Sequence, residues 1–391
     1  MKSVAIICEY NPFHLGHAYH AEQARKFSGA DAVVGIMSGH FVQRAEPSCL
    51  GVGLRTEVAL RSGVDCIIQM PAIFSSACGN IFARGAVDIL SKIPSVKYLA
   101  MGVEDDGELI TQIAHVQSLE AEAFISVLKS ELNSGASYPA AITKATAKNI
   151  KTMSEEKCAD ILSKPNNVLA IEYLKEIFSR NLDITLLFVR REGNNYNDES
   201  VSGRFISATA ARKLMREGDF TTLSKYLPSA CFEIVKEEVL SRPVNMPVYE
   251  ALVIQSLRNR AVKAYDAEEG LSAKMSENAD KYCSLERILS ETKSKRYTMS
   301  RLRRACVQSL LGIDEGIMAL SPYAKGKLIG IKESMRGFIK ELPDIAVKNK
   351  DFYCDERTAE VAKIDAKAAA VHALITGRCG NEFTDSRLIT I

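Results

Sequence analysis

The sequence lacks any long apolar run. No window of its 391 residues approaches the roughly eighteen uncharged apolar positions that a membrane-spanning helix requires. Its first residues, Met1-Lys2-Ser3, lead into a short apolar run that meets a charge at Glu9, so a signal peptide's length and cleavage site are both missing. We therefore expect neither a membrane span nor an export signal, and we expect the protein in the cytoplasm.

The sequence also lacks paired cysteines and a strong charge of one sign. Its ten cysteines are scattered from Cys8 to Cys379 without a C-x-x-C motif. In a chain of this length without an export signal, this pattern predicts free buried thiols rather than disulfides or a zinc site. The net charge of +2 excludes a polycation, so any affinity for nucleic acid must come from local patches.

Strand-like and helix-like patterns alternate in the first part of the chain. Short apolar runs at 4–8, 32–37, 66–70, 98–101 and 183–189 are typical of buried strands. Helical patterns occupy 19–27, 54–62, 82–91, 108–132 and 167–180. This alternation predicts an α/β fold: a doubly wound, Rossmann-like parallel sheet with helices on both faces.

The second part of the chain reads as mostly helical. Three prolines, Pro228, Pro243 and Pro247, suggest a boundary between a catalytic domain at 1–230 and a helical domain at 231–391. Helical patterns follow at 249–263, 284–290, 300–311 and 359–376, with a short strand near 327–331.

A pair of histidines follows the first predicted strand directly. His14-Leu15-Gly16-His17 has the form of the HIGH signature of nucleotidyltransferases and class I aminoacyl-tRNA synthetases. A strand, a turn and a helix N-terminus form an anion site, and two histidines can donate to the phosphates of ATP there. The alternatives are a chance tetrapeptide in a surface turn, or a zinc site with His20 that lacks the i, i+4 spacing of two ligands on one helical face.

Other polar residues are predicted at the same edge of the sheet. Within 204–212, Ser207 or Thr209 would cap a second helix, and Arg212 would lie in the first turn of that helix, where it could contact phosphates. The alternative is an ordinary capped helix with a solvated arginine. Gly102 and Arg191 end later strands, although Arg191 could also belong to a surface hairpin. A loop after the second strand adds candidates for contacts with acetate or the acceptor, which are His40, Gln43 and Arg44.

In these motifs the chain resembles the tRNA(Met) cytidine acetate ligases. The resemblance rests on Glu9-Tyr10-Asn11-Pro12-Phe13-His14-Leu15-Gly16-His17 and on the runs at 37–44, 135–139, 164–173, 191–196, 206–212 and 295–298. The family pattern has glycine where Ala45 stands, Lys-Trp-x-Arg around Gly53-Leu54-Arg55, and Glu at Gln69, whereas this chain has no tryptophan. These departures lie outside the predicted ATP site and concern recognition of acetate or of the acceptor.

The resemblance implies an ATP-binding α/β domain followed by a helical domain. It implies that acetate is activated as acetyl-adenylate and that the acetyl group passes to N4 of the wobble cytidine of elongator tRNA(Met), giving N4-acetylcytidine. Mg²⁺ is expected with ATP, no resident metal site is expected, and His14, His17, Arg191 and Arg212 are the expected catalytic residues. The implied ATP contacts are Ile7, Cys8, Glu9, Tyr10, Asn11, Pro12, Phe13, His14, Leu15, Gly16, His17, Ala18, Tyr19, His20, Gly102, Asn166 and Arg191, to which the capped-helix motif adds Ser207 and Thr209.

Two basic stripes are candidates for holding tRNA, although a run of charge is often only a solvated face. One consists of Lys144, Lys148 and Lys151; the other consists of Lys293, Lys295, Arg296, Arg301, Arg303 and Arg304, with Tyr297 available to stack on a base. Two alternative functions share the histidine motif. A small-molecule adenylyltransferase would not need the helical second half, and a non-catalytic nucleotide- or RNA-binding protein would not need both histidines and the arginines.

Overall fold

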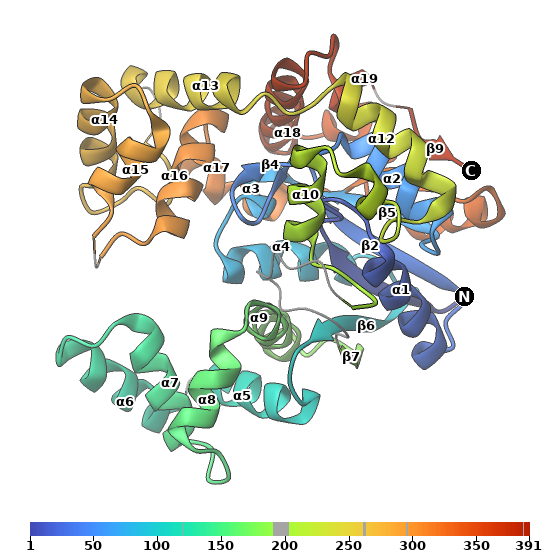
Figure 1. Ribbon diagram of the computed structural model, residues 1–391. Helices are drawn as coiled ribbons and strands as arrows, with labels where there is room; N and C mark the ends of the chain where they lie inside the picture. The colour runs from blue at the N-terminus through green and yellow to red at the C-terminus, as the bar shows by residue number, and fades with distance from the viewer. Residues whose placement is uncertain (120, 191–202, 261–262, 295, 386) are drawn as a thin grey trace.

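The computed structural model describes residues 1–391 except 120, 191–202, 261–262, 295 and 386 (Figure 1). Its centre is a seven-stranded sheet in the order β7-β6-β1-β2-β5-β8-β9. The strands are β1 (Ser3–Cys8), β2 (Ala32–Ser38), β5 (Cys66–Met70), β6 (Val96–Val103), β7 (Thr185–Arg190), β8 (Lys327–Ile331) and β9 (Ile389–Thr390), and a separate hairpin joins β3 (Phe41–Val42) to β4 (Glu46–Pro47). The predicted α/β class with a mostly parallel sheet is confirmed.

Helices connect and cover these strands. The first half contains α1 (Leu15–Ser28), α2 (Val52–Arg61), α3 (Ala72–Ser75), α4 (Gly79–Ser91), α5 (Gly107–Leu119), α6 (Glu122–Asn133), α7 (Tyr138–Lys148), α8 (Glu155–Ser163) and α9 (Pro165–Ser179). The second half contains α10 (Ala208–Glu217), α11 (Phe220–Leu223), α12 (Phe232–Ser241), α13 (Met246–Asn259), α14 (Leu271–Lys281), α15 (Leu285–Thr292), α16 (Met299–Leu311), α17 (Glu315–Ala319), α18 (Glu356–Ile375) and α19 (Glu382–Asp385). Short 3₁₀ helices lie at Ser229–Cys231, Ser321–Tyr323, Glu333–Glu341 and Asn349–Phe352.

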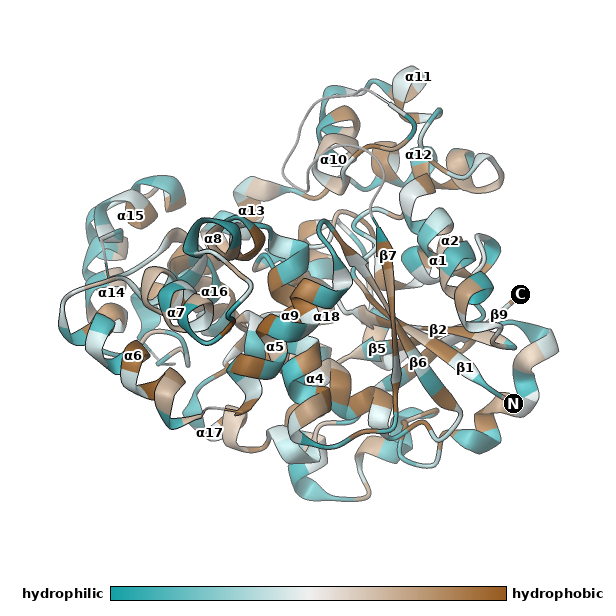
Figure 2. Ribbon diagram, turned by 90° about the horizontal axis from the view of Figure 1, so that it is seen from below, coloured by the Kyte–Doolittle hydropathy of each residue, from teal (hydrophilic) through white to brown (hydrophobic). Residues whose placement is uncertain are grey.

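The two faces of the sheet are covered by different helices. Successive side chains of a strand point to opposite faces, so Val4 and Ile6 of β1 pack in one cluster with α1, α2 and α10. Ala5 and the alternate residues of β2 and β5 pack in a second cluster with α4 and α9. Figure 2 shows the apolar strands between these helical layers. A buried central sheet with two covered faces explains why the strands read as continuous apolar runs.

The order of the strands creates one topological switch point. The chain passes from β1 outward to β2 and β5, and then crosses to β6 on the other side of β1. The strands β1, β2, β5, β6 and β7 pair in parallel, so their carboxyl ends share one edge. In open α/β sheets, ligands bind at the carboxyl ends of strands beside such a switch point. The ends of β1 and β6 are therefore the expected place for the site.

The predicted helix at 108–132 is wrong in one respect, because the structure divides it into α5 and α6. The two parts have different partners: α5 packs against α9, whereas α6 packs against α7. One straight helix could not pack against both α9 and α7, although the apolar pattern of residues 108–132 is nearly continuous. Together with α7 and α8 these helices form the green group below the sheet in Figure 1.

The predicted division at residue 230 does not separate the sheet from the helical part. From the second segment, β8 pairs antiparallel with β5, and β9 extends the sheet beside β8. The prolines instead mark the connection between α12 and α13, because Pro243 lies between them and Pro247 lies in the first turn of α13. The helices α13 to α17 form the yellow and orange group beyond the sheet in Figure 1.

All ten cysteines are free, as predicted, but the prediction that they are buried holds for only five, which are Cys8, Cys66, Cys158, Cys231 and Cys306. Three others are exposed: Cys283, Cys354 and Cys379. Among the described residues, no helix has the length and apolar character needed to cross a membrane.

Candidate active site

A cavity of about 150 Å³ opens at the switch point. Ile7 and Glu9 at the end of β1, and Gly102 near the end of β6, contribute to its wall. A second hollow of about 70 Å³ adjoins it and is lined by His14, Gly16 and Arg190, among others. The two hollows share His17, His20 and Gly102. The structure therefore brings together the two main elements that were predicted to contact ATP, the β1–α1 turn and Gly102.

The two histidines of the signature are fixed by the helix that they begin. His14 is the N-cap of α1, and its Nδ1 accepts a hydrogen bond from the Gly16 N–H at 3.1 Å. The His14 N–H in turn donates to His17 Nδ1 at 3.3 Å, and the two rings stack with centroids 3.8 Å apart. Because each Nδ1 accepts, each neutral ring carries its proton on Nε2, where it can serve as a donor.

Gly16 leaves room for the ring of His14. A Cβ at residue 16 would lie 2.9 Å from Cε1 of His14. The space that this glycine leaves is thus filled by the His14 ring of the same turn, which allows the N-cap contact to form.

A second helix N-terminus faces the cavity. Ser207 caps α10, and its Oγ accepts a hydrogen bond from the Ala210 N–H at 3.0 Å. Thr209 and Arg212 line the cavity, whereas Ser207 is buried behind it. Of the two predicted caps, the structure therefore selects Ser207, and it leaves Thr209 facing the site. The positive end of the helix dipole and the guanidinium both favour an anion there.

Arg44 and Arg212 converge on this helix end. Arg44 Nη1 donates to Thr209 Oγ1 at 3.2 Å, and Arg212 Nη2 lies 3.4 Å from the same oxygen. Arg212 Nη1 also donates to the carbonyl oxygen of Asn11 at 2.7 Å, and Glu46 lies 3.3 Å from Nη2. Two guanidinium groups beside a helix N-terminus form a site suited to phosphate or to another oxyanion.

Gln43, Arg44 and Asn166 also line the cavity, as predicted for ligand contacts. Asn166 lies in the first turn of α9, and its amide donates to Glu104 Oε1 at 2.7 Å. The predicted Arg191 lies outside the described residues, whereas the preceding Arg190 lines the smaller hollow. What these residues bind stays a prediction.

Arg55 is a residue whose role was not predicted from the sequence. Its side chain is fully buried on α2. Nη1 donates to the carbonyl oxygens of Glu9 at 2.6 Å and Ser38 at 3.1 Å, and Nη2 donates to that of Gly39. Burial lowers its pKa. Arg55 therefore joins the carboxyl ends of β1 and β2. The sequence signals for it were the arginine of the family's Lys-Trp-x-Arg run and a charged residue among the apolar positions of a helix.

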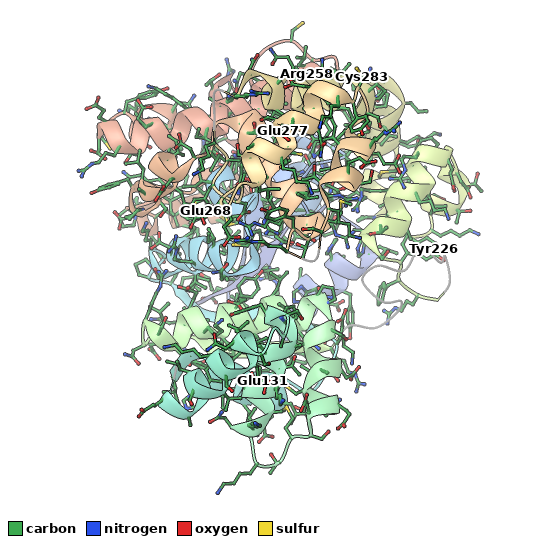
Figure 3. All side chains as sticks on the ribbon, turned by 90° about the vertical axis from the view of Figure 1, so that its left-hand side faces the viewer. Glu131, Tyr226, Arg258, Glu268, Glu277 and Cys283 are labelled. Carbon is green, nitrogen blue, oxygen red and sulfur yellow. The ribbon has the colours of Figure 1, made fainter. Side chains whose placement is uncertain are left out.

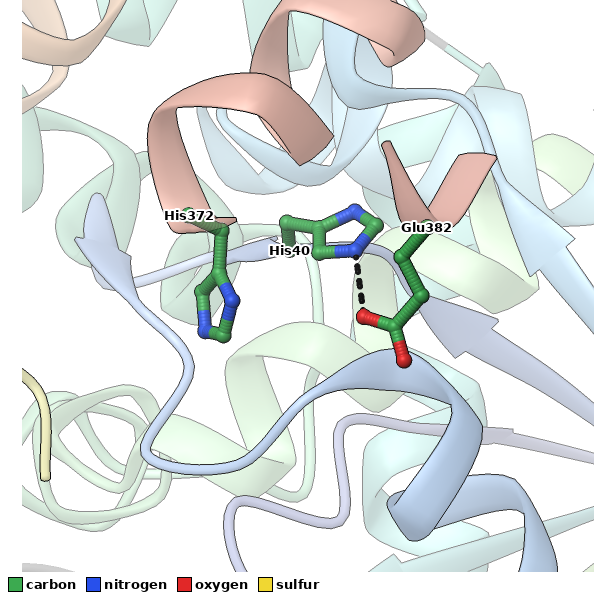
Figure 4. Close-up of side chains that lie close together, drawn as sticks. All are labelled: His40, His372 and Glu382. Carbon is green, nitrogen blue, oxygen red and sulfur yellow. Dashed lines mark hydrogen bonds and ion pairs between the residues drawn. The ribbon is translucent and has the colours of Figure 1, made fainter. Parts of the chain in front are cut away.

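His40 does not line the cavity. It is buried, and its Nε2 lies 3.0 Å from Oε2 of Glu382 in α19 (Figure 4). Glu382 also accepts hydrogen bonds from the backbone N–H groups of Gly53 at 2.8 Å and Val52 at 3.2 Å. His40 thus ties the loop after β2 to the C-terminal part of the chain, and its predicted contact with acetate or the acceptor has no support from this position.

His40, Glu382 and His372 of α18 form the one group of ligand-type side chains that the described residues bring together, within 4.8 Å of one another (Figure 4). Burial lowers the pKa of His40; Glu382 offsets part of this change, and the positive charges of Arg55 and Arg378 add to it. The same two charges oppose a cation, and the carboxylate already has its hydrogen bonds. The group is therefore best described as a structural link: His40 is hydrogen-bonded to Glu382, and His372 is hydrogen-bonded to Ser48 in the loop after β2.

This link should make the protein sensitive to acid. Burial, with a smaller effect from His40, lowers the pKa of His372 from 6.5 to about 3. The unfolded chain therefore binds the proton first as the pH falls, and stability is lost from about pH 6.5 towards pH 3. By pH 5 we expect His372 alone to lower the free energy of unfolding by about 2 kcal/mol.

Urea unfolding at pH 7 and pH 5 measures this loss. The variant His372→Gln should be less stable than the wild type at pH 7, yet its stability should fall by about 2 kcal/mol less between the two pH values. Equal losses in the two proteins would contradict the assignment.

Several side chains of the two basic stripes already form ion pairs, so only some of them are exposed and available for contact with tRNA. Lys144 pairs with Glu131 at 2.7 Å, whereas Lys148 and Lys151 are exposed; Glu131 is labelled in Figure 3 on the lower helical group. In the other stripe Glu269 pairs with Arg296 at 2.9 Å, and Asp266 pairs with Arg304 at 2.5 Å. Tyr297 donates to the carbonyl oxygen of Glu269 at 2.7 Å, and Lys295 lies outside the described residues. Lys293 and Arg303 are exposed.

Fold and site define the class of protein. Residues 1–384 match the family described as HIGH Nucleotidyl Transferase, so the chain belongs to the HIGH nucleotidyltransferases. It is 33% identical over 396 residues to the tRNA(Met) cytidine acetate ligase of Caldicellulosiruptor saccharolyticus, covering 96% of this chain and 94% of that protein. It is 31% identical to the same enzyme of Acetivibrio thermocellus, with 100% of both chains covered. The chain is a member of the tRNA(Met) cytidine acetate ligase family.

Solved structures agree with this assignment. The apo crystal structure of Thermotoga maritima TmcAL superposes with a TM-score of 0.89 at 28% identity, and all of both chains is covered. A second structure of that protein, bound with alpha-thio ATP, gives a TM-score of 0.87 at 27% identity.

Proposed function

We propose that this protein uses ATP to activate acetate as acetyl-adenylate, with release of pyrophosphate, and then transfers the acetyl group to N4 of the wobble cytidine of elongator tRNA(Met). The observation that carries the proposal is that the His14–His17 pair and the capped end of α10 with Arg212 line two adjoining hollows that share His17. The names of the relatives support a ligase that acts on this tRNA. The ATP analogue bound by Thermotoga maritima TmcAL supports ATP as the nucleotide.

The first step needs positioning and positive charge rather than a base. Acetate is already an anion, so the barrier comes from repulsion between two anions and from charge that grows on the leaving pyrophosphate. The Nε2–H groups of His14 and His17, the α10 N-terminus and Arg212 supply fixed donors for that charge. Arg44 is placed to hold a carboxylate or a phosphate oxygen beside them.

Mg²⁺ fits this site as a companion of the phosphates. Glu9 is the single carboxylate among the described residues that line the two hollows. Mg²⁺ typically keeps several waters and binds through substrate phosphates with one or two carboxylates. When bound, it would neutralise phosphate charge.

The second step uses the energy stored in the mixed anhydride. The N4 lone pair of cytidine is delocalised into the ring, so it needs an acyl group on a good leaving group such as AMP. The tRNA must also be held while one base enters the cavity.

One experiment separates this proposal from the two alternatives. The protein is incubated with ATP, labelled acetate and bulk tRNA, and both tRNA-bound label and pyrophosphate are measured. The proposed ligase gives both products. A small-molecule adenylyltransferase would leave tRNA unlabelled, and a non-catalytic protein would release no pyrophosphate.

The exposed arginines of the second stripe should contribute to tRNA binding. We expect the double variant Arg296→Ala/Arg303→Ala to bind tRNA more weakly and to lower the slope of log affinity against log salt by about 1 to 2, because each lost phosphate contact removes about one counterion release. The effect should come mainly from Arg303, since Arg296 is paired with Glu269.

Filter binding at several salt concentrations measures this slope. Arg336→Ala removes an exposed arginine in the 3₁₀ helix Glu333–Glu341 and serves as the control. If the double variant and the control bind tRNA alike, this stripe does not hold the tRNA.

A further inference from the structure

A third hollow, of about 470 Å³, adjoins the site and is called the outer hollow here. It is lined by residues of α1, of the turn after α2 and of the segment before α10. It shares Tyr19 and Phe205 with the smaller hollow of the site, to which His14 and His17 belong. A molecule in the outer hollow would therefore lie next to the histidine pair, with these two side chains between them.

Arg204 and two aromatic rings form a layered group in the outer hollow. The rings of Tyr19 and Phe205 have their centroids 5.4 Å apart and are tilted by 33°. The guanidinium carbon of Arg204 lies 4.9 Å from the centroid of the Phe205 ring and 5.5 Å from that of Tyr19. Phe205 is buried, whereas Arg204 is exposed. A flat, charged group therefore covers the two rings and is itself accessible.

This combination suits an unpaired nucleobase. Unstacked bases of RNA stack on aromatic side chains and on the planes of arginine guanidinium groups. The guanidinium group is always charged and more weakly hydrated than an ammonium group, so its face can hold a base while its N–H groups reach a phosphate. The outer hollow thus offers the chemistry of a contact with single-stranded RNA.

The proposed function, on which this inference rests, creates a need for such a contact. The wobble cytidine has to leave the stack of the anticodon loop so that its N4 can reach the acetyl group. The nucleotides on its two sides then lose a stacking partner, and they must lie just outside the space that the cytidine and the adenylate occupy. We propose that the stack of Arg204 on Tyr19 and Phe205 holds the base of one of these two flanking nucleotides of tRNA(Met).

The variant Arg204→Lys tests the proposal, because it keeps the positive charge and removes the plane. We expect it to bind elongator tRNA(Met) about 10-fold more weakly than the wild type, which is the size of effect that loss of one stacked base produces. The slope of log affinity against log salt should stay that of the wild type, because the charge is kept. Filter binding without ATP and acetate measures both quantities. The control Arg216→Lys, an exposed arginine in the last turn of α10, should bind like the wild type.

Two synthetic tRNAs identify the base. Each lacks a single base, on the 5′ or the 3′ side of the wobble cytidine, and keeps the sugar and the phosphate. One of them should bind the wild type about 10-fold more weakly than intact tRNA, and Arg204→Lys should bind that tRNA no more weakly still, because the stacked pair is already lost. With the other abasic tRNA, Arg204→Lys should still weaken binding by about 10-fold.

Three results would overturn the proposal. Arg204→Lys could bind intact tRNA as the wild type does, or its loss could add to that of both abasic tRNAs; in either case no flanking base lies on the stack. An equal loss of affinity for ATP alone would assign the stack to the nucleotide. The proposed function is tested separately, since a wild type that gives no tRNA-bound acetyl label refutes that function whatever Arg204→Lys does to binding.

Discussion

Replacing either histidine of the signature by alanine should reduce acetate-dependent pyrophosphate release by at least about 10²-fold, as loss of a preorganised donor to developing negative charge does in other enzymes. Each of these rings offers Nε2–H, since its Nδ1 already accepts a backbone N–H. The variants His14→Ala and His17→Ala remove the donors while the sheet and its helices remain. The measurement is the initial rate of pyrophosphate release at saturating acetate and ATP.

His14 also caps α1, so its two roles must be separated. His14→Ala removes the cap as well as the donor and should cost about 1 kcal/mol of stability. His14→Asn is the matched variant, because asparagine caps helices well but cannot place a donor where the imidazole Nε2–H lies. It should unfold near the wild-type midpoint and still be inactive. Full activity in His14→Asn or in His17→Ala would remove the histidines from the mechanism.

Replacing the buried arginine of α2 should have the largest effect on stability. Arg55→Met keeps much of the side-chain volume but leaves the carbonyl oxygens of Glu9, Ser38 and Gly39 without their donor. An unsatisfied buried polar group costs about 1–3 kcal/mol, so we expect a total loss of about 3–5 kcal/mol. Urea unfolding monitored by circular dichroism measures this loss.

Two further variants serve as comparisons for Arg55→Met. Arg55→Lys retains the charge, but a single ammonium lacks the planar fork that reaches both strand ends, so it should restore only part of the stability. Arg61→Met lies at the exposed end of the same helix, where its ion pair with Glu57 contributes less than about 1 kcal/mol. Should Arg55→Met be as stable as Arg61→Met, the three hydrogen bonds would not be what joins β1 to β2.

The sequence predicted the central strands and the histidine turn beside the cavity because their signals are local. Apolar runs mark β1, β2 and β5, and the His14 cap lies two residues from the Gly16 N–H that it accepts. The predicted role of the capped helix at Ser207 depended on the same kind of short-range pattern. Such short-range patterns can be recognised without knowledge of the rest of the fold.

The remaining features depend on contacts between distant segments. Arg55 reaches an oxygen 46 positions away, and His40 meets a carboxylate 342 positions away. From the sequence, His40 was predicted to contact a ligand because it lies in a loop near the predicted site. The structure instead places it beside Glu382. The antiparallel β8 was likewise a short apolar run whose place next to β5 follows from tertiary packing rather than from its pattern.

The bond between His40 and Glu382 has a consequence for the order in which the protein matures. Gln43 and Arg44, which face the cavity, follow His40 closely in one short loop. During synthesis the ribosome delivers this loop early, but its carboxylate partner emerges only after more than three hundred further residues. The hydrogen bond between His40 and Glu382 therefore cannot form until residue 382 has been made. A chain that terminates before that point would lack the contact that holds this loop beside the cavity.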